Sequence, residues 1–211
     1  MHLVKRFITK VLTNDVNCVI IHIKVKTLIN IKEIFMKVYL ASQIFAECWR
    51  DYNLKVAERI KSAYPDIDLY VPQLNKAIND KTLYANAEDI AVGDLNNNLN
   101  QDDIIVAIVD GDTAGTGTTV ECAYFARMCQ EEIDRQGYTN KKIISLYTDS
   151  RECSQTVIPE KVDALHEFAE NQFSYLNLLL VGILKRYGVM CRSIDEVIEE
   201  LGKAIKAYDE G

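Results

Sequence analysis

The chain has 211 residues, which is long enough for one domain with a sizeable core and a short appendage. Hydrophobic residues make up 48% and charged residues 26%, a balance that is typical of a globular protein. The net charge of −7 argues against a groove for DNA or RNA, which needs positive charge along the phosphates, and favours a small, neutral or weakly charged ligand.

Residues 1–35 differ in charge from the rest of the chain. They hold six Lys and Arg against Asp15 and Glu33, which gives a local charge of +4. Since the whole chain carries −7, residues 36–211 carry about −11. No apolar run reaches the roughly 18 residues that a membrane span needs. Because Met36 directly precedes a strand pattern, we expect residues 1–35 to be a basic extension outside the core and residues 36–211 to form the domain. A basic targeting arm is the alternative, although the segment is poor in Arg and Ser.

From Met36 on, segments with the pattern of a strand alternate with segments with the pattern of a helix. Strands are predicted at 37–41, 68–73, 103–109 and 141–149. Helices are predicted at 45–64, at 81–99, from about 119, at 160–170, at 175–188 and at 193–208. The third strand, "DIIVAIV", is an unbroken apolar run of the kind that is buried on both faces of a parallel sheet.

Apolar residues spaced by three or four define the first two predicted helices. These stripes are Phe45, Trp49, Tyr52, Val56, Ile60 and Tyr64 in the first, and Leu83, Ala87, Ile90 and Leu95 in the second. The segment 175–188 is apolar on most sides, which predicts burial or a subunit contact. A capping box of Ser193 and Glu196 opens the last helix.

The alternation of strands and helices predicts an α/β fold: a Rossmann-like or flavodoxin-like, doubly wound parallel sheet with helices on both faces. Such sheets bind ligands at the carboxyl ends of their strands. Tyr39, Gln73, Asp110 and Asp149 end the four predicted strands, and the Gly-rich loop "GDTAGTGTT" follows the third. We therefore expect the site at that edge of the sheet.

The six cysteines form no C-x-x-C pair, and their spacing fits neither a zinc site nor a small disulfide scaffold. We interpret them as reduced, mostly buried thiols of a cytoplasmic protein. Neither a metal nor a cofactor is predicted. The six cysteines are Cys18, Cys48, Cys122, Cys129, Cys153 and Cys191.

Glu121 lies near the start of the helix that follows the Gly-rich loop. One interpretation is structural, because "TTVE" (118–121) has the form of a T-x-x-E capping box. The other is chemical, because the start of a helix favours an ionised carboxylate. A dinucleotide site is not expected: Gly115 and Gly117 match two glycines of G-x-G-x-x-G, but Val120 stands where the third would be.

Four segments together resemble the nucleoside 2-deoxyribosyltransferase family. In order, they are "KVYLASQIF", "GDLNNNLNQDDIIVAIVDG", "GTGTTVECAYFARM" and "AENQFSYLN", and the resemblance covers about residues 36–175. That family has an Asp on the helix before the third strand and a D-x-G-T-x-x-E-x-G-Y-A loop and helix. The resemblance implies a Rossmann-like fold, a homo-oligomer with sites shared between subunits, nucleoside and nucleobase as partners, and a Glu that becomes deoxyribosylated.

The resemblance assigns roles to individual positions. Glu121 matches the nucleophile and Tyr39 matches a tyrosine beside it. Asp94 matches a substrate-binding Asp, and Asn171 matches an asparagine that a neighbouring subunit supplies to the sugar hydroxyls. Gln73 matches a glutamine that contacts the base.

The chain departs from the family's pattern next to the nucleophile. The family's Asp six positions before the Glu falls on Gly115, and Ala123 stands where the family has a Gly. The family's Asp helps to hold the sugar and to move a proton to the base. Asp112, on the Gly-rich loop, is our candidate to replace it, and Asp110 is the second candidate. Gly117, in the same loop, is a further substrate-binding candidate.

Most of these residues also have a plain structural interpretation. Asp94 can be a solvated residue near a helix end, and Tyr39 can be a core residue of its strand. Asn171 can end its helix in the left-handed conformation.

The residue types suit cleavage of an N-glycosidic bond. A carboxylate against C1′ of 2-deoxyribose stabilises the oxocarbenium-like transition state and can trap the sugar, while an acid assists the departing base. Attack by a second nucleobase then gives transfer, and attack by water gives hydrolysis. Two alternatives stay open: an N-glycosidase for deoxynucleoside 5′-monophosphates, with Ser42 near the phosphate, and a non-catalytic nucleoside- or nucleotide-binding module.

Overall fold

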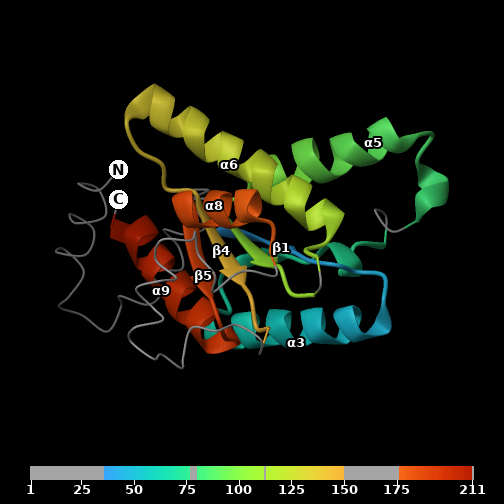
Figure 1. Cartoon of the computed structure of the whole chain (residues 1–211), viewed down its shortest axis with the longest axis horizontal. Coiled ribbons are helices and arrows are strands. Elements are labelled where there is room, and N and C mark those ends of the chain that lie inside the picture. The colour runs from blue at the N-terminus through green and yellow to red at the C-terminus, as the bar shows by residue number, and fades with distance from the viewer. Residues whose placement is uncertain (1–35, 77–79, 112, 150–175, 211) are drawn as a thin grey trace, which may run out of the picture. The chain divides into compact units, whose positions relative to one another are not determined.

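The computed structural model describes residues 36–76, 80–111, 113–149 and 176–210. Within them one sheet is formed by β1 (Lys37–Ala41), β2 (Asp68–Tyr70), β3 (Ile104–Ile108), β4 (Lys142–Leu146) and β5 (Gly188–Cys191). The strands lie in the order β2-β1-β3-β4-β5, and each neighbouring pair is parallel (Figure 1). This order is that of flavodoxin-like folds, and it confirms the predicted doubly wound α/β architecture.

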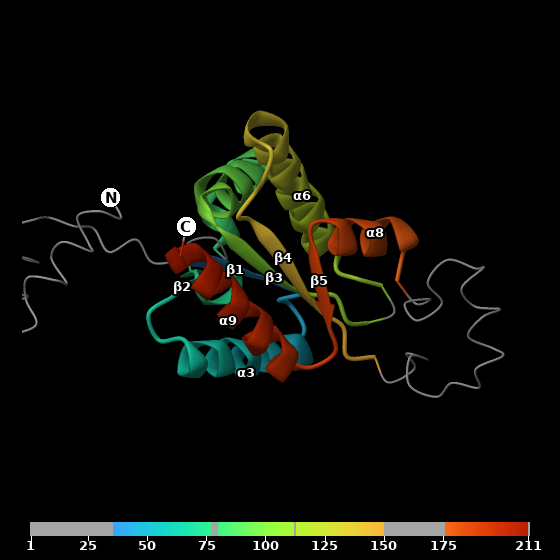
Figure 2. The same ribbon diagram turned by 90° about the vertical axis from the view of Figure 1, so that its left-hand side faces the viewer.

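Helices cover both faces of the sheet. The helices α3 (Glu47–Ala63) and α9 (Ile194–Glu210) lie on one face, and α6 (Thr116–Gln136) and α8 (Leu178–Arg186) lie on the other (Figure 2). The short helix α5 (Ala87–Ala91) lies beside α6 (Figure 1). Every residue of β3 is buried, as expected of a central parallel strand covered on both sides.

Successive residues of β1 point to opposite faces of the sheet, as in any strand. Val38 and Leu40 join the buried cluster under α3 and α9, which includes Val56, Ile60, Val197 and Leu201. Tyr39 and Ala41 join the cluster under α6 and α8, which includes Phe125, Leu180 and Leu184. Tyr39 therefore enters the layer that contains α6, and its neighbours in β1 do not.

The prediction missed β5. Its four residues, Gly188–Cys191, begin two residues after the last residue of α8. The predicted helix at 175–188 included the first residue of this strand, so no separate strand was predicted. Only the pairing with β4 shows the segment as a strand, with Ile144 opposite Val189 and Leu146 opposite Cys191. The predicted helix at 160–170 lies outside the described residues.

The prediction of one helix over 81–99 was wrong. The segment consists of a 3-10 turn (Lys81–Leu83), α5, a π-helix (Val92–Asn98) and a second 3-10 turn (Leu99–Gln101). Leu83, which the predicted apolar stripe included, is 66% exposed. The Asn86 side chain accepts from the Asp89 N–H and starts the helix there, which divides the segment.

Smaller boundaries also differ from the prediction. Phe45 precedes α3 and is 83% exposed, so it does not belong to the buried stripe of that helix. β2 ends at Tyr70, and Gln73 lies in a 3-10 turn (Pro72–Leu74). The capping box of the last helix is present, since Ser193 Oγ accepts from the Glu196 N–H. Across the described ranges, none of the helices has the length and apolar character of a membrane span.

The pairing of β5 with β4 yields a test of the fold. An ideal Cβ at Gly188 would lie 1.7 Å from Ile143 O, so Gly188→Ala should force the two strands apart. We expect a loss of about 3 kcal/mol in the free energy of unfolding. Gly182→Ala on α8 is the control, because no atom lies within 4 Å of a Cβ there. This variant should be more stable than wild type by up to about 1 kcal/mol in the free energy of unfolding, since Ala favours a helix more than Gly does. Urea unfolding measures both, and a Gly188→Ala variant as stable as wild type would contradict the β4–β5 register.

Candidate active site

A hydrogen bond between Tyr39 and Glu121 lies at the centre of the candidate site. The Tyr39 Oη donates to Glu121 Oε1 at 2.7 Å, and the two residues are 82 positions apart in the chain. Tyr39 comes from β1 and is 1% exposed, whereas Glu121 comes from the second turn of α6 and is partly buried. The fold therefore brings together two residues that the resemblance placed side by side.

Glu121 does not cap its helix. α6 begins at Thr116 with Gly115 at the N-cap position, so Thr118 lies inside the helix. The Thr119 Oγ1 donates to Gly115 O at 3.0 Å. The capping-box interpretation of "TTVE" is therefore wrong, because the helix starts three residues earlier than predicted and the Glu121 side chain is directed to β1.

Burial dominates the acid–base behaviour of Glu121. Desolvation raises the pKa of its carboxyl to about 7, the hydrogen bond from Tyr39 works in the opposite direction, and the charge of Asp94 raises it further. This differs from the expectation that the helix start favours the ionised form. Burial and the Glu121 charge likewise hold the Tyr39 pKa far above its usual value, so Tyr39 keeps its proton and remains the donor.

Asp94 lies in the π-helix and is half-buried. It lies near enough to add to the effect of burial on the pKa values of Glu121, Tyr39 and Tyr70. A π-helix is rare and occurs often at functional sites. The structure thus places Asp94 close enough for its charge to act on the Tyr39–Glu121 pair, on an element that sequence patterns do not distinguish from an α-helix.

Sequence reasoning did not select Tyr70, which belongs to the same cluster. Its ring lies 5.3 Å from that of Tyr39 between centroids, with a tilt of 36°. The two tyrosines are register partners in β1 and β2, and Asn75 Nδ2 donates to Tyr70 Oη at 3.1 Å. The available signal was its position inside the second predicted strand, 68–73, which the alternating strand and helix pattern places beside the first.

The other candidates are placed less directly. Gln73 is engaged at both ends of its carboxamide: Oε1 accepts from Asn53 Nδ2 at 2.8 Å and Nε2 donates to Arg50 O at 3.0 Å. Ser42 is half-buried in the loop after β1, and Gly117 is exposed in the first turn of α6. Asp112 and Asn171 lie outside the described residues, so their roles stay predictions.

Asp110, the second candidate for the missing acid, is held in another contact. Both of its carboxylate oxygens accept from Thr148, one from the backbone N–H and the other from Oγ1 at 2.8 Å. Asp110 thus links the end of β3 to the chain after β4. Burial raises its pKa, and the two bonds to Thr148 oppose that effect.

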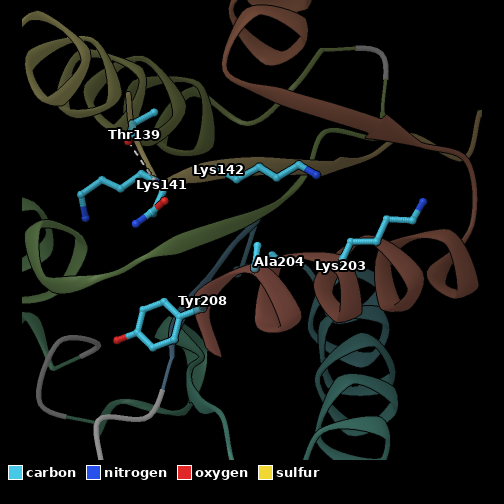
Figure 3. A pocket seen from close by; sticks show the side chains of 8 residues that line it. Thr139, Lys141, Lys142, Lys203, Ala204 and Tyr208 are labelled. Carbon is cyan, nitrogen blue, oxygen red and sulfur yellow. Dashed lines mark hydrogen bonds between the residues drawn. The ribbon is translucent and has the colours of Figure 1, made fainter. Parts of the chain in front are cut away.

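A separate cavity of about 250 Å³ lies at the amino end of β4, away from the loops that follow the strands (Figure 3). Lys142 and Lys203 line it, and each forms an ion pair with Glu200 at 2.7 Å. It contains neither Tyr39 nor Glu121. Among the described residues, no cluster of three or more His, Cys, Asp or Glu could hold a metal ion.

The raised pKa of Glu121 makes stability depend on pH. A buried carboxyl with a raised pKa contributes stability that is complete below its ordinary pKa of 4.5 and is lost as the pH rises through about 7. Glu121→Gln keeps an oxygen that accepts from Tyr39 but carries no charge. We therefore expect the variant to gain stability over wild type as the pH rises, by at most about 3 kcal/mol near pH 8.

Urea unfolding of wild type and Glu121→Gln across this pH range checks the expectation. Glu131→Gln on the exposed side of α6, where Glu131 pairs with Arg127, is the control and should stay within about 0.5 kcal/mol of wild type. A stability difference between Glu121→Gln and wild type that is constant from pH 4.5 to above 7 would show that the Glu121 carboxyl is not perturbed.

Comparisons with known proteins identify the family of the chain. A family model described as nucleoside 2-deoxyribosyltransferase matches residues 38–179. No curated protein matches the chain. Among solved structures, the crystal structure of a conserved protein from Enterococcus faecalis V583 is 36% identical, with a TM-score of 0.63, and the match covers 80% of this chain and 98% of that one. The family match spans about two thirds of the sequence, from the first strand to the start of α8, and the chain belongs to the nucleoside 2-deoxyribosyltransferase family.

Proposed function

We propose that the protein is a nucleoside 2-deoxyribosyltransferase-like enzyme. It cleaves the N-glycosidic bond of a 2′-deoxynucleoside through a covalent deoxyribosyl–Glu121 intermediate and passes the sugar to another nucleobase or to water. Members of the family typically transfer or cleave glycosyl groups. The observation that carries the proposal is the buried Glu121 carboxyl with a pKa of about 7 and a hydrogen bond from Tyr39.

Glu121 has the properties of a nucleophile for an anomeric carbon. With a pKa of about 7, a large fraction of its carboxyl groups is ionised at neutral pH. Its partly buried position removes competing water, which strengthens the attraction between the carboxylate and the positive charge that develops on the sugar. In the step proposed, a Glu121 oxygen bonds to C1′, the C1′–N bond breaks, and the electron pair of that bond leaves with the base.

Tyr39 and Asp94 support this step in different ways. The Tyr39 hydroxyl holds Glu121 Oε1, which leaves the second carboxylate oxygen for C1′. The Asp94 carboxylate is an acceptor for substrate hydroxyl or amino groups, and we propose that it binds the substrate. Gly117, Ser42, Asp112 and Asn171 remain proposed contacts, as does Gln73, whose carboxamide already has protein partners at both ends.

A second candidate function is the N-glycosidase for deoxynucleoside 5′-monophosphates. The first turn of α6 contains no acidic residue, and its N-cap Gly115 provides no side-chain hydrogen bond. The amide groups of such a helix start suit an anion. Ser42, in the loop after β1, can add a hydrogen bond to a phosphate. A helix start with Gly115 therefore suits a phosphate better than one with an Asp at position 115, whose negative charge would repel it. A non-catalytic binding module is the third possibility.

We also propose a cytoplasmic homo-oligomer. Its partners are small molecules, a nucleoside and a nucleobase, and it acts without a cofactor. Support for assembly comes from Leu178 and Leu179 at the start of α8, which are 50% and 75% exposed although α8 packs on the sheet. Three of the four described cysteines are buried free thiols, as expected of a protein in a reducing compartment.

One assay separates the three functions. Wild type is incubated with a 2′-deoxynucleoside or its 5′-monophosphate, with and without a second free base. Exchange of the base indicates a transferase, and free deoxyribose or its phosphate indicates a hydrolase. A rise in melting temperature without turnover indicates a binding module. For the proposed enzyme we expect exchange of the base with the 2′-deoxynucleoside, with the monophosphate turned over more slowly.

Substitution at Glu121 then tests the nucleophile in the same assay. Glu121→Gln should lower the rate by about 10³-fold or more, because the charge that stabilises the sugar cation is removed. Glu131→Gln should retain the wild-type rate, because Glu131 lies on the exposed side of α6. A Glu121→Gln variant with wild-type turnover would exclude Glu121 as the nucleophile.

A further inference from the structure

The absence of a side chain at position 115 is explained by a neighbouring residue and not by the backbone. Gly115 has φ −54° and ψ 135°, which any residue can adopt. An ideal Cβ at this position would lie 2.7 Å from Gln43 Cγ, 3.5 Å from Gln43 Cδ and 3.3 Å from Thr118 Oγ1. The Gln43 side chain thus occupies the space that a side chain at position 115 would enter.

The main chain of Gln43 is firmly held. Asn53, which is fully buried in α3, donates from Nδ2 to Gln43 O at 2.9 Å. The same nitrogen donates to Gln73 Oε1, and Gln73 Nε2 donates to Arg50 O. These bonds connect the loop after β1 to α3 and to the turn after β2, so the position of Gln43 is fixed by three elements.

The carboxamide of Gln43 differs from its main chain in this respect. It makes no hydrogen bond to the part of the chain that the structure describes, although the residue is half-buried. An ideal Cβ at Gly111, which has φ +110°, would lie 3.6 Å from Gln43 Nε2 and 3.5 Å from Trp49 Cζ2. An amide without a hydrogen-bond partner among the described residues therefore lies near Gly111 and Gly115, beyond the carboxyl ends of β1 and β3, where sheets of this kind bind ligands.

We propose that Gln43 contacts the nucleobase of the substrate in place of an acid at position 115. The inference rests on the proposed function. A carboxamide can donate a hydrogen bond but cannot release a proton. As Glu121 bonds to C1′ and the C1′–N bond breaks, the base keeps the electron pair and leaves as an anion that accepts from the Gln43 N–H. Solvent water then protonates the released base.

This arrangement determines which bases the enzyme releases well. An acid at position 115 would neutralise every base as it leaves, so the rate would depend little on the stability of the free anion. A neutral amide stabilises the anion only in part. The rate should therefore rise strongly with the acidity of the free base, and electron-poor bases should be preferred donors.

The test uses pairs of 2′-deoxynucleosides that differ by one substituent on the base. One pair carries 5-fluorouracil and thymine, the other 6-chloropurine and adenine, and kcat/KM for release of the base is measured for each. Gln43→Met keeps the aliphatic part of the side chain, which lies against Gly115, and removes the amide. We expect it to lower kcat/KM by about 10- to 100-fold for thymine and adenine, and less for the electron-poor partners.

Gln43→Glu provides a second, independent variant. It introduces a proton donor, so the difference within each pair should shrink at low pH and return as the pH rises. A residue that only packs would change the melting temperature of the variants but would leave the ratio within each pair at its wild-type value. The melting temperature of each variant is therefore measured beside its kinetics.

Gly115→Ala tests the coupling between the two positions. Its Cβ should displace Gln43 and reproduce the loss seen in Gln43→Met, and the double variant should show no further loss. Losses that multiply in the double variant, or wild-type kinetics and wild-type ratios in both Gln43 variants, would overturn the proposal. A wild-type protein that releases no base from any of the four nucleosides would instead overturn the proposed function, and this inference with it.

Discussion

The candidate site depends on the hydrogen bond from Tyr39 to Glu121. It joins β1 to the second turn of α6 across the layer that holds Phe125 and Leu180, so both the parallel sheet and the packing of α6 must form before it exists. Burial in this layer raises the pKa of Glu121, and the Tyr39 hydroxyl opposes the rise. The balance of these two effects leaves a carboxyl near pKa 7, which is buried yet can still be ionised at neutral pH.

Much of the fold could be predicted because its signals are local. The buried run of β3 and the alternation of strand and helix patterns identify a parallel doubly wound sheet, and the strand order confirms it. Tyr39 and Glu121 were selected from short motifs, since the one lies in the strand pattern "KVYLA" and the other follows a Gly-rich loop. Tyr39 is the third of the five residues of β1 and not its last, contrary to the prediction. The contact between Tyr39 and Glu121 follows from the fold, because β1 and the start of α6 meet at the same edge of the sheet.

The features that were missed depend on contacts between distant segments. β5 is recognisable only through its pairing with β4, and Tyr70 joins the site only because β2 lies beside β1. The start of α6 was misplaced because "TTVE" fits a capping box, although helix packing directs Glu121 to Tyr39. Gln43 has no motif of its own, and its relation to Gly115 appears only when the two backbones are placed side by side.

The covalent intermediate is the central claim, and mass spectrometry tests it most directly. Wild type is mixed with a 2′-deoxynucleoside in the absence of an acceptor base, stopped with acid within one turnover, and digested. The account predicts a deoxyribosyl group on the peptide that contains Glu121, and none on the same peptide of the Glu121→Gln variant. Release of the base with that peptide unmodified in wild type at every time point would contradict it.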